Sequence, residues 1–514
     1  MKPFAKLKDA IFRLFGRISA LFYVKKSGLD NVCEPKVVGE CDAAVGSAHR
    51  EMVLSLKNPG IYFPKLYQIV KNLFALIRSV AYGGKYVFCI TAVAFLCWLS
   101  GNQSAGIIAM LILSTVAMFA TRDIMPAVLP ILLLGFVVPA QTASSDFISD
   151  YVVAITFSMI GFVAAVAYVL SAKPLTLGEH FWPYLAMSVA FIVAGLGFES
   201  YNSSTIFQLG VTTLVFVFYF VARNGVRTFN KLYLVKIFAA LAILITAEII
   251  VYYLRCKDIS TAINLKTLDL GWGISNCAAA ALMITIPICL YGFLNTKRLT
   301  YLATMLVGYV GIIMTLSRGC MLIAALFLPV ILGVIFVNSK NKRQMAVVSA
   351  VIVAVIAIVL LIIEELCTGI IERLLKMGFS DSGRLNIYKT AISDFLSSPV
   401  FGVGVHNPRD PYGSIYWYHS TPLQFLACAG VVGIAAYGFH LVKLGQRLLR
   451  ALSKPFNQCI LLAIVQWGIY GYMDVNFFFP CQAFCMAILI VFHEQHAEEL
   501  GLKKGKITRN FNKM

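Results

Sequence analysis

Two histidines lie close to the start of an apolar run in the last third of the sequence. His406 and His419 fall in GVGVHNPRDPYGSIYWYHSTPLQF, residues 402–425, together with Arg409 and the aromatic residue Trp417. An imidazole can take a proton from a hydroxyl group near neutral pH, so either histidine is a candidate general base. The alternative for His419 is a structural place in a belt of aromatic residues at a membrane interface.

Two arginines also stand where cations need an explanation. Arg318 interrupts the apolar stretch LVGYVGIIMTLSRGCMLIAALFL, and an arginine at membrane depth usually pairs with another group or lines an aqueous cavity. Arg384 begins a segment with apolar residues at helical spacing, which predicts a helix that stops at Pro399. An arginine at a helix N-terminus suits a phosphate. The alternatives are a snorkelling arginine at a turn for Arg318 and an exposed surface arginine for Arg384.

Glu248 is a carboxylate inside the apolar run 232–254, toward its outer end. It could neutralise an arginine or hold an acceptor sugar, and a purely structural ion pair is equally consistent. Taken together, the arginines and an imidazole suit a reaction on a sugar linked to polyprenyl pyrophosphate. The arginines would stabilise the diphosphate leaving group, and the imidazole would deprotonate the attacking hydroxyl.

The composition indicates a membrane protein that must position these groups. Of 514 residues, 59% are hydrophobic and 13% charged, and the mean hydropathy is +0.81, which leaves too little charge for a soluble exterior. The net charge of +19 comes from short clusters between apolar runs, which excludes a nucleic-acid-binding face. The 13 cysteines form no CxxC pair and no zinc spacing with histidine, so neither a disulfide framework nor a metal site is indicated.

About fourteen apolar runs are long enough to be membrane segments. We expect an all-α polytopic protein with spans near residues 86–100, 104–121, 124–141, 151–171, 184–199, 204–222, 232–254, 277–294, 299–316, 320–337, 345–363, 421–441, 457–473 and 480–493. Lysine and arginine gather in alternate loops, which places those loops and both termini in the cytoplasm. His406 and His419 are then the two histidines that face outward.

The same pattern predicts five regions along the chain. Residues 1–83 form a basic cytoplasmic region in which MKPFAKLKDAIFRLFGRISALFYVKK reads as an amphipathic helix on an anionic leaflet, or as a topology-setting tail. Two transmembrane parts, 84–363 and 421–493, enclose a large helical extracytoplasmic loop, 364–420, expected to carry the catalysis. Residues 494–514 form a basic cytoplasmic tail.

The order of these motifs resembles the O-antigen ligase and polysaccharide polymerase membrane family. The resemblance covers roughly residues 310–435 and consists of SR at an outer turn, SGRxxxYxxAxxxFxxxPxxGxG, and an aromatic-rich histidine before a GxxG-bearing span. The family often has His-Asn where this chain has His419-Ser420, while His406-Asn407 lies upstream. We favour His419 because its spacing to the following span fits the family, and His406 remains the competitor.

The resemblance implies a GT-C-type glycosyltransferase in the cytoplasmic membrane that uses an undecaprenyl-pyrophosphate glycan as donor and needs no nucleotide sugar or metal. It implies diphosphate binding by Arg318 and Arg384 and base catalysis by His419. Further substrate contacts are expected from Arg409, Tyr388, Trp417, His406 and Glu248. The expected partners are a glycan or lipid acceptor, membrane lipids, a flippase and a chain-length regulator, and no nucleic acid.

Two questions stay open from the sequence. Polymerase and ligase differ only in acceptor, which no motif identifies. A flippase for lipid-linked oligosaccharides, or another multispan transporter, is the alternative of a different class, although transporters are often built from repeated halves and no internal repeat is visible.

Overall fold

The computed structural model describes residues 64–137, 145–196, 203–258, 261–262, 267–270, 273–339, 341–366, 383–405, 416–449 and 452–501. The chain divides into two compact units, residues 1–71 and 72–514, and the second unit contains the helical bundle. The amphipathic helix expected near the N-terminus lies outside the described residues.

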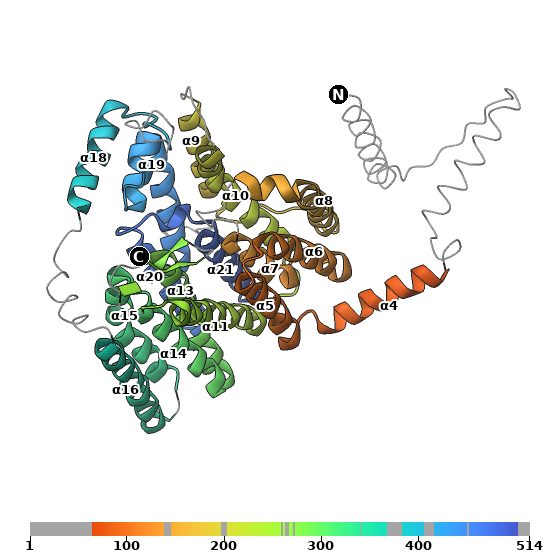
Figure 1. The fold of residues 1–514 in the computed structure, drawn as a ribbon, viewed down its shortest axis with the longest axis horizontal. Coiled ribbons are helices and arrows are strands. Elements are labelled where there is room, and N and C mark those ends of the chain that lie inside the picture. The colour runs from red at the N-terminus through yellow and green to blue at the C-terminus, as the bar shows by residue number, and fades with distance from the viewer. Residues whose placement is uncertain are drawn as a thin grey trace, which may run out of the picture. The chain divides into compact units, whose positions relative to one another are not determined.

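Helices account for nearly all of the described structure (Figure 1). Each of the fourteen predicted apolar runs falls on a helix: α5 (Gly84–Leu99), α6 (Gln103–Thr121), α7 (Val128–Val137), α8 (Ser145–Leu170), α9 (Phe181–Gly195), α10 (Ser203–Gly225), α11 (Lys231–Arg255), α13 (Ser275–Thr296), α14 (Leu299–Met314), α15 (Arg318–Val337), α16 (Lys342–Leu366), α19 (Thr421–Leu448), α20 (Pro455–Tyr470) and α21 (Pro480–Glu499). The other elements are α4 (Pro64–Val80), α18 (Arg384–Ser397), the 3-10 turns η1 (Met125–Ala127) and η2 (Asn476–Phe478), and a short antiparallel hairpin of β1 (Asp269–Leu270) and β2 (Gly273–Ile274).

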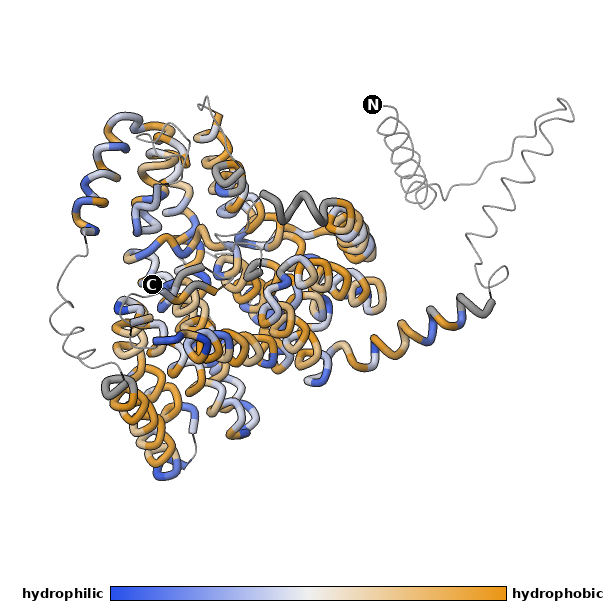
Figure 2. The backbone as a smooth tube through the Cα atoms, in the orientation of Figure 1, coloured by the Kyte–Doolittle hydropathy of each residue, from blue (hydrophilic) through white to orange (hydrophobic). Residues whose placement is uncertain are grey.

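Within these residues, seven helices are long and apolar enough to cross a membrane, or eight if the bent pair α4 and α5 counts as one span. The all-helical membrane fold is therefore confirmed, whereas the count of fourteen spans is not. Part of the difference is length, since α9 has 15 residues and α14 has 16, fewer than the roughly 20 that a helix needs to cross about 30 Å of hydrocarbon. Figure 2 shows the apolar residues concentrated along helices such as α15 and α16.

Helix α13 forms the centre of the bundle. Its span is buried throughout, and it packs against α11, α14, α15 and α20. A helix that is apolar on all sides belongs in the interior, and the four consecutive alanines 278–281 let neighbouring helices approach closely.

The helix ends meet in two groups that match the loop alternation expected from sequence. At one end, Tyr253 of α11 donates a hydrogen bond to Met314 O of α14, and Thr421 N of α19 donates to Gly471 O after α20. At the other end, Lys231 of α11 pairs with Glu499 of α21. Tyr253 and Lys231 thus mark opposite ends of α11, the first beside the end of α14 and the second beside the end of α21.

Helix α19 is interrupted at Gly430, whose φ of 62° is non-helical. The turn that follows α18 is hydrogen-bonded into this break: Val403 N and Gly404 N donate to Ala427 O and Cys428 O, while Val431 N and Val432 N donate to Pro399 O and Val400 O. A Cβ atom at Gly430 would lie 2.3 Å from Val400 O, so only glycine permits this close approach.

Candidate active site

His419 lies immediately before α19 in a left-handed backbone conformation, with φ at 47°. Its Nδ1 is 3.4 Å from Asp474 Oδ1, in the turn after α20. The imidazole is 35% exposed, whereas the carboxylate is 7% exposed. Left-handed conformations are costly for residues with a Cβ and gather at functional sites. The ring is thus held by a buried acid and still reaches the surface.

Asp474 is the centre of a hydrogen-bond network. Its Oδ1 accepts from Val475 N at 2.9 Å, and its Oδ2 accepts from Tyr470 OH at 3.0 Å and from Asn276 Nδ2 at 3.3 Å. Burial raises the pKa of Asp474, but the hydrogen bonds from His419, Val475 N–H and Tyr470 and the His419 charge outweigh it and leave the pKa below its ordinary value. The carboxylate is therefore ionised at neutral pH, and accepts from His419 Nδ1–H in the tautomer that leaves Nε2 free to take a proton.

Tyr388 joins α18 to this pair. Its hydroxyl lies 3.3 Å from His419 O and 3.4 Å from Tyr472 O, toward both of which it can donate. Burial raises the pKa of Tyr388, the positive charge of Arg384 lowers it and the negative charge of Asp474 raises it, so both charges lie near the phenol. Arg384 is one helical turn before Tyr388 on the same face of α18. The structure thus brings Arg384 to the His419–Asp474 pair.

Arg318 is the first residue of α15, directly after a tight turn. Leu316 in that turn is also left-handed, with φ at 50°. Gly319 faces Tyr470 and Met473, because a Cβ there would lie 3.2 Å from the Tyr470 ring and 3.3 Å from the Met473 sulfur. Arg318, half-buried, therefore starts its helix against the Tyr470–Asp474 turn. The structure places it at the same end of the bundle as His419 and Arg384.

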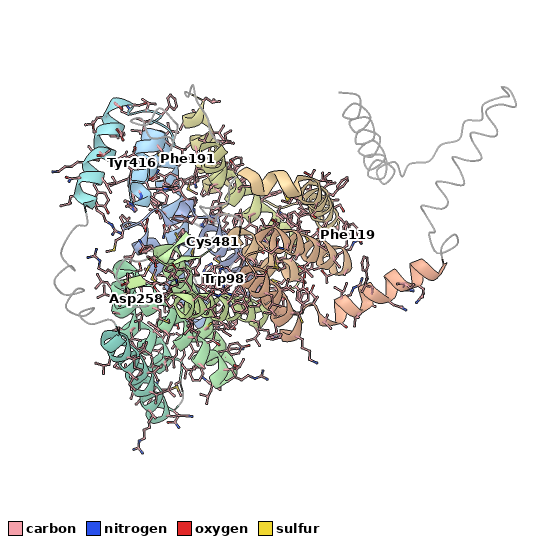
Figure 3. The ribbon with its side chains drawn as sticks, in the orientation of Figure 1. Trp98, Phe119, Phe191, Asp258, Tyr416 and Cys481 are labelled. Atoms are coloured by element: carbon pink, nitrogen blue, oxygen red, sulfur yellow. The ribbon has the colours of Figure 1, made fainter. Side chains whose placement is uncertain are left out.

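The aromatic residues before His419 are packed against the protein. Trp417 stacks on Phe479, with ring centroids 5.9 Å apart. Tyr418 donates a hydrogen bond to Asp394 of α18 at 2.6 Å. Tyr416, labelled in Figure 3, accepts through its carbonyl from Gln424 in the first turn of α19. These contacts fix the segment that leads into His419, and Trp417 stays half-exposed beside it.

Three other predicted residues have different outcomes. Glu248 is buried on α11, between Thr246, which donates to Val307 O, and Tyr253, which donates to Met314 O. It therefore lies on the part of α11 that packs against α14, the helix before the turn that precedes Arg318. His406 and Arg409 lie outside the described residues.

Sequence reasoning missed Asp474. The stretch DVNFFFP indicates, by its composition, only an outer loop without lysine or arginine. A signal was present, because Asp474 is the one acidic residue between positions 457 and 493, and a lone carboxylate at the end of an apolar run is a candidate functional group. Among the residues that the structure describes, no group of three or more histidine, cysteine, aspartate or glutamate side chains could hold a metal ion.

Part of this chain is similar to a known protein family. No curated protein matches the chain. Residues 301–438 match the family model described as O-antigen ligase, and this interval contains Arg318, Arg384 and His419, whereas Asp474 lies beyond it. The match confirms the resemblance found in the sequence: over residues 301–438 the chain carries a domain of the O-antigen ligase family.

Proposed function

We propose that this protein is a membrane glycosyltransferase, a glycan polymerase or ligase that acts at the outer face of the cytoplasmic membrane. The observation that carries the proposal is the His419–Asp474 pair at 3.4 Å, with Arg384 one turn from the tyrosine that contacts His419. The family match over residues 301–438 supports the reaction class.

In this mechanism the donor is a glycan linked to undecaprenyl pyrophosphate. His419 Nε2 takes the proton of an acceptor hydroxyl as its oxygen bonds to the anomeric carbon. The bond from that carbon to the diphosphate oxygen breaks, and the electron pair leaves with the diphosphate. Arg384 and Arg318 stabilise the negative charge that grows on this leaving group, while Asp474 orients the imidazole and stabilises its protonated form.

His419 is proposed as the base because it has an ionised carboxylate partner, and His406, outside the described residues, is the competing candidate. Arg409, His406, Trp417 and Tyr388 are proposed to contact the substrates, with Trp417 offering a face for a sugar. Glu248 is proposed to help position the acceptor or to neutralise the charge of Arg318.

The setting proposed for the reaction follows the sequence pattern. The two groups of helix ends support an arrangement with the site outside and both termini in the cytoplasm. We also propose a GT-C-type architecture for this protein. The reaction would need no metal and no nucleotide sugar. Its proposed partners are a flippase and a chain-length regulator.

The test is glycan profiling on gels in cells that lack this gene, complemented with wild type, Arg384→Ala or the control Lys389→Ala. Lys389 lies on the same helix but is exposed, so its loss should leave glycan assembly unchanged. Loss of long polymer with single lipid-linked repeats left on the outer leaflet would identify a polymerase. Long lipid-linked polymer that never reaches its acceptor would identify a ligase. Repeats trapped on the inner leaflet would refute both and indicate a flippase.

A further inference from the structure

Helix α18 has three different faces. Ala391 and Asp394 are buried against the protein, and Lys389 and Ser393 are exposed on a polar face. Between these two faces, Ile392 and Leu396, which are one helical turn apart, form an exposed apolar stripe. A helix in water would place polar residues there, so the stripe needs a partner.

The stripe continues past the end of the helix. Ile392, Leu396, Val400 and Phe401 are between 43% and 67% exposed. Next to them lie Val431 and Val432 of the spanning helix α19, also exposed and joined to Pro399 and Val400 by backbone hydrogen bonds. The apolar surface of α18 is therefore continuous with the surface that α19 presents outside the bundle.

The break in α19 fixes the depth of this surface. Gly430 lies nine residues after Thr421, the first residue of α19, which corresponds to roughly 14 Å along a helix. Because the turn 398–404 is hydrogen-bonded into that break, Val400 and Phe401 lie at the level of Gly430, and a first turn of α19 at the outer boundary of the hydrocarbon layer would place them roughly 14 Å into its roughly 30 Å.

Non-helical backbone at that depth is tolerated only where its polar groups are satisfied by protein. Five backbone groups of the turn are paired in this way: Val403 N, Gly404 N, Pro399 O and Val400 O bond to α19, and Gly402 N donates to Ser398 O. The side of the turn that faces α19 is thus hydrogen-bonded, while the side chains of Val400 and Phe401 are about half exposed.

We propose that residues 384–405 form a re-entrant segment of the outer leaflet, with Ile392, Leu396, Val400 and Phe401 in contact with lipid acyl chains. The inference rests on the proposed function only in taking the first turn of α19 as the outer one. The polar face with Lys389 and Ser393 then borders the aqueous side. Arg384, at the other end of a helix about 21 Å long, reaches the level of the headgroups, where the diphosphate of a polyprenyl donor also lies.

The test is photocrosslinking of the full-length protein in nanodiscs made of one phosphatidylglycerol of known mass. Benzoylphenylalanine is introduced at one position at a time, as Phe401→Bpa, Leu396→Bpa or the matched control Ser393→Bpa. Intact-protein mass spectrometry then measures the lipid adduct. We expect roughly tenfold more adduct at 401 and 396 than at 393, because acyl chains replace water around the apolar stripe. Alkaline hydrolysis should leave a fatty acid on the protein.

Equal yields at 393 and 401 would overturn the proposal, as would an adduct that retains only the glycerol headgroup after hydrolysis. A crosslink to a second copy or to another part of this chain would show that protein covers the stripe. Leu396→Bpa serves as the second probe if Phe401→Bpa does not insert. No donor or activity is needed, so an inactive protein that still forms acyl adducts would refute the proposed function alone.

Discussion

The molecule contains two histidine–carboxylate–tyrosine groups, one at each end of the bundle. In the outer group, His419 lies 3.4 Å from Asp474, which accepts from Tyr470 at 3.0 Å. In the inner group, His180 lies 3.0 Å from Glu494, which accepts from Tyr219 at 3.0 Å. His440 of α19, whose ring lies 5.8 Å from that of His180, is 21 positions after His419 and lies beyond the break at Gly430.

Exposure separates the two groups. The imidazole and carboxylate of the inner pair are each 1% exposed, and Arg223 of α10 approaches the same carboxylate at 3.3 Å. These buried contacts thereby connect the loop before α9 to helices α10 and α21, and their low exposure leaves no access for a substrate. The same three kinds of side chain therefore form a buried structural contact at one end and a candidate catalytic base at the other. The difference arises because, of the two imidazoles, that of His419 reaches the surface.

Replacing each of the two histidines should have the largest and most different effects. We expect His419→Ala to lower glycan transfer about 10²- to 10⁴-fold, the range for loss of a general base, with unchanged membrane insertion and thermal stability. His180→Ala should instead lower the yield of folded protein and its melting temperature, while the protein that remains folded stays active. Transfer per folded molecule, measured with purified variants, tests both. Full transfer by His419→Ala would move the base to His406 or remove base catalysis.

At the inner carboxylate, Glu494→Gln should destabilise the protein by about 1.5–3 kcal/mol, because the neutral amide loses the charge-assisted contacts to His180 and Arg223, although Arg223 keeps Glu498. Glu498→Gln is the matched control, since Glu498 pairs with the same arginine but is 47% exposed, so its loss should cost little. Thermal unfolding in detergent measures the difference. Equal melting temperatures for the two variants would contradict a stabilising role for the buried contacts of Glu494.

Asp474→Asn should lower transfer roughly 10- to 100-fold, because a hydrogen bond to a charged group contributes about 1.5–3 kcal/mol. The amide can still occupy the site, so the ring keeps a neighbour but loses its anionic partner. A role in orienting the base predicts a changed pH profile and a lower kcat with little change in KM, whereas a purely structural role would lower stability alone. Asp474→Glu should restore part of the activity.

The smallest effect concerns stability and pH. Because the pKa of Asp474 is depressed below the ordinary 3.8, its contribution to stability is complete above that value and is lost as the pH falls through the folded-state pKa. The difference in melting temperature between wild type and Asp474→Asn should therefore persist at pH 5 and above, and shrink only below roughly pH 4. A difference that shrank between pH 7 and 5 would mean that the pKa of this carboxylate is not depressed.

The sequence predicted much of this arrangement. All fourteen apolar runs are helical because length and hydropathy are local properties, and α18 begins at Arg384 and stops before Pro399 as expected. The position of Arg318, Arg384 and His419 at one end of the bundle was expected from the alternation of the loops, and the family resemblance implied their roles. The His419–Asp474 pairing could not be predicted, since 55 positions separate the two residues and they are brought together by hydrogen bonds from Thr421, at the start of α19, to the turn after α20. The break at Gly430 was equally hidden, because glycine is common in membrane helices.

The four hydrogen bonds between the turn 399–404 and the break in α19 also restrict the length of the segment that carries Arg384. They fix one end of α18, while Tyr388 fixes the other end at the carbonyl of His419. Inserting one residue between these two points would turn Arg384 by about 100° and shift it by roughly 1.5 Å relative to the imidazole. The segment from Arg384 to Gly404 therefore has a fixed length, and insertions there would misalign the arginine and the base even though both residues were retained.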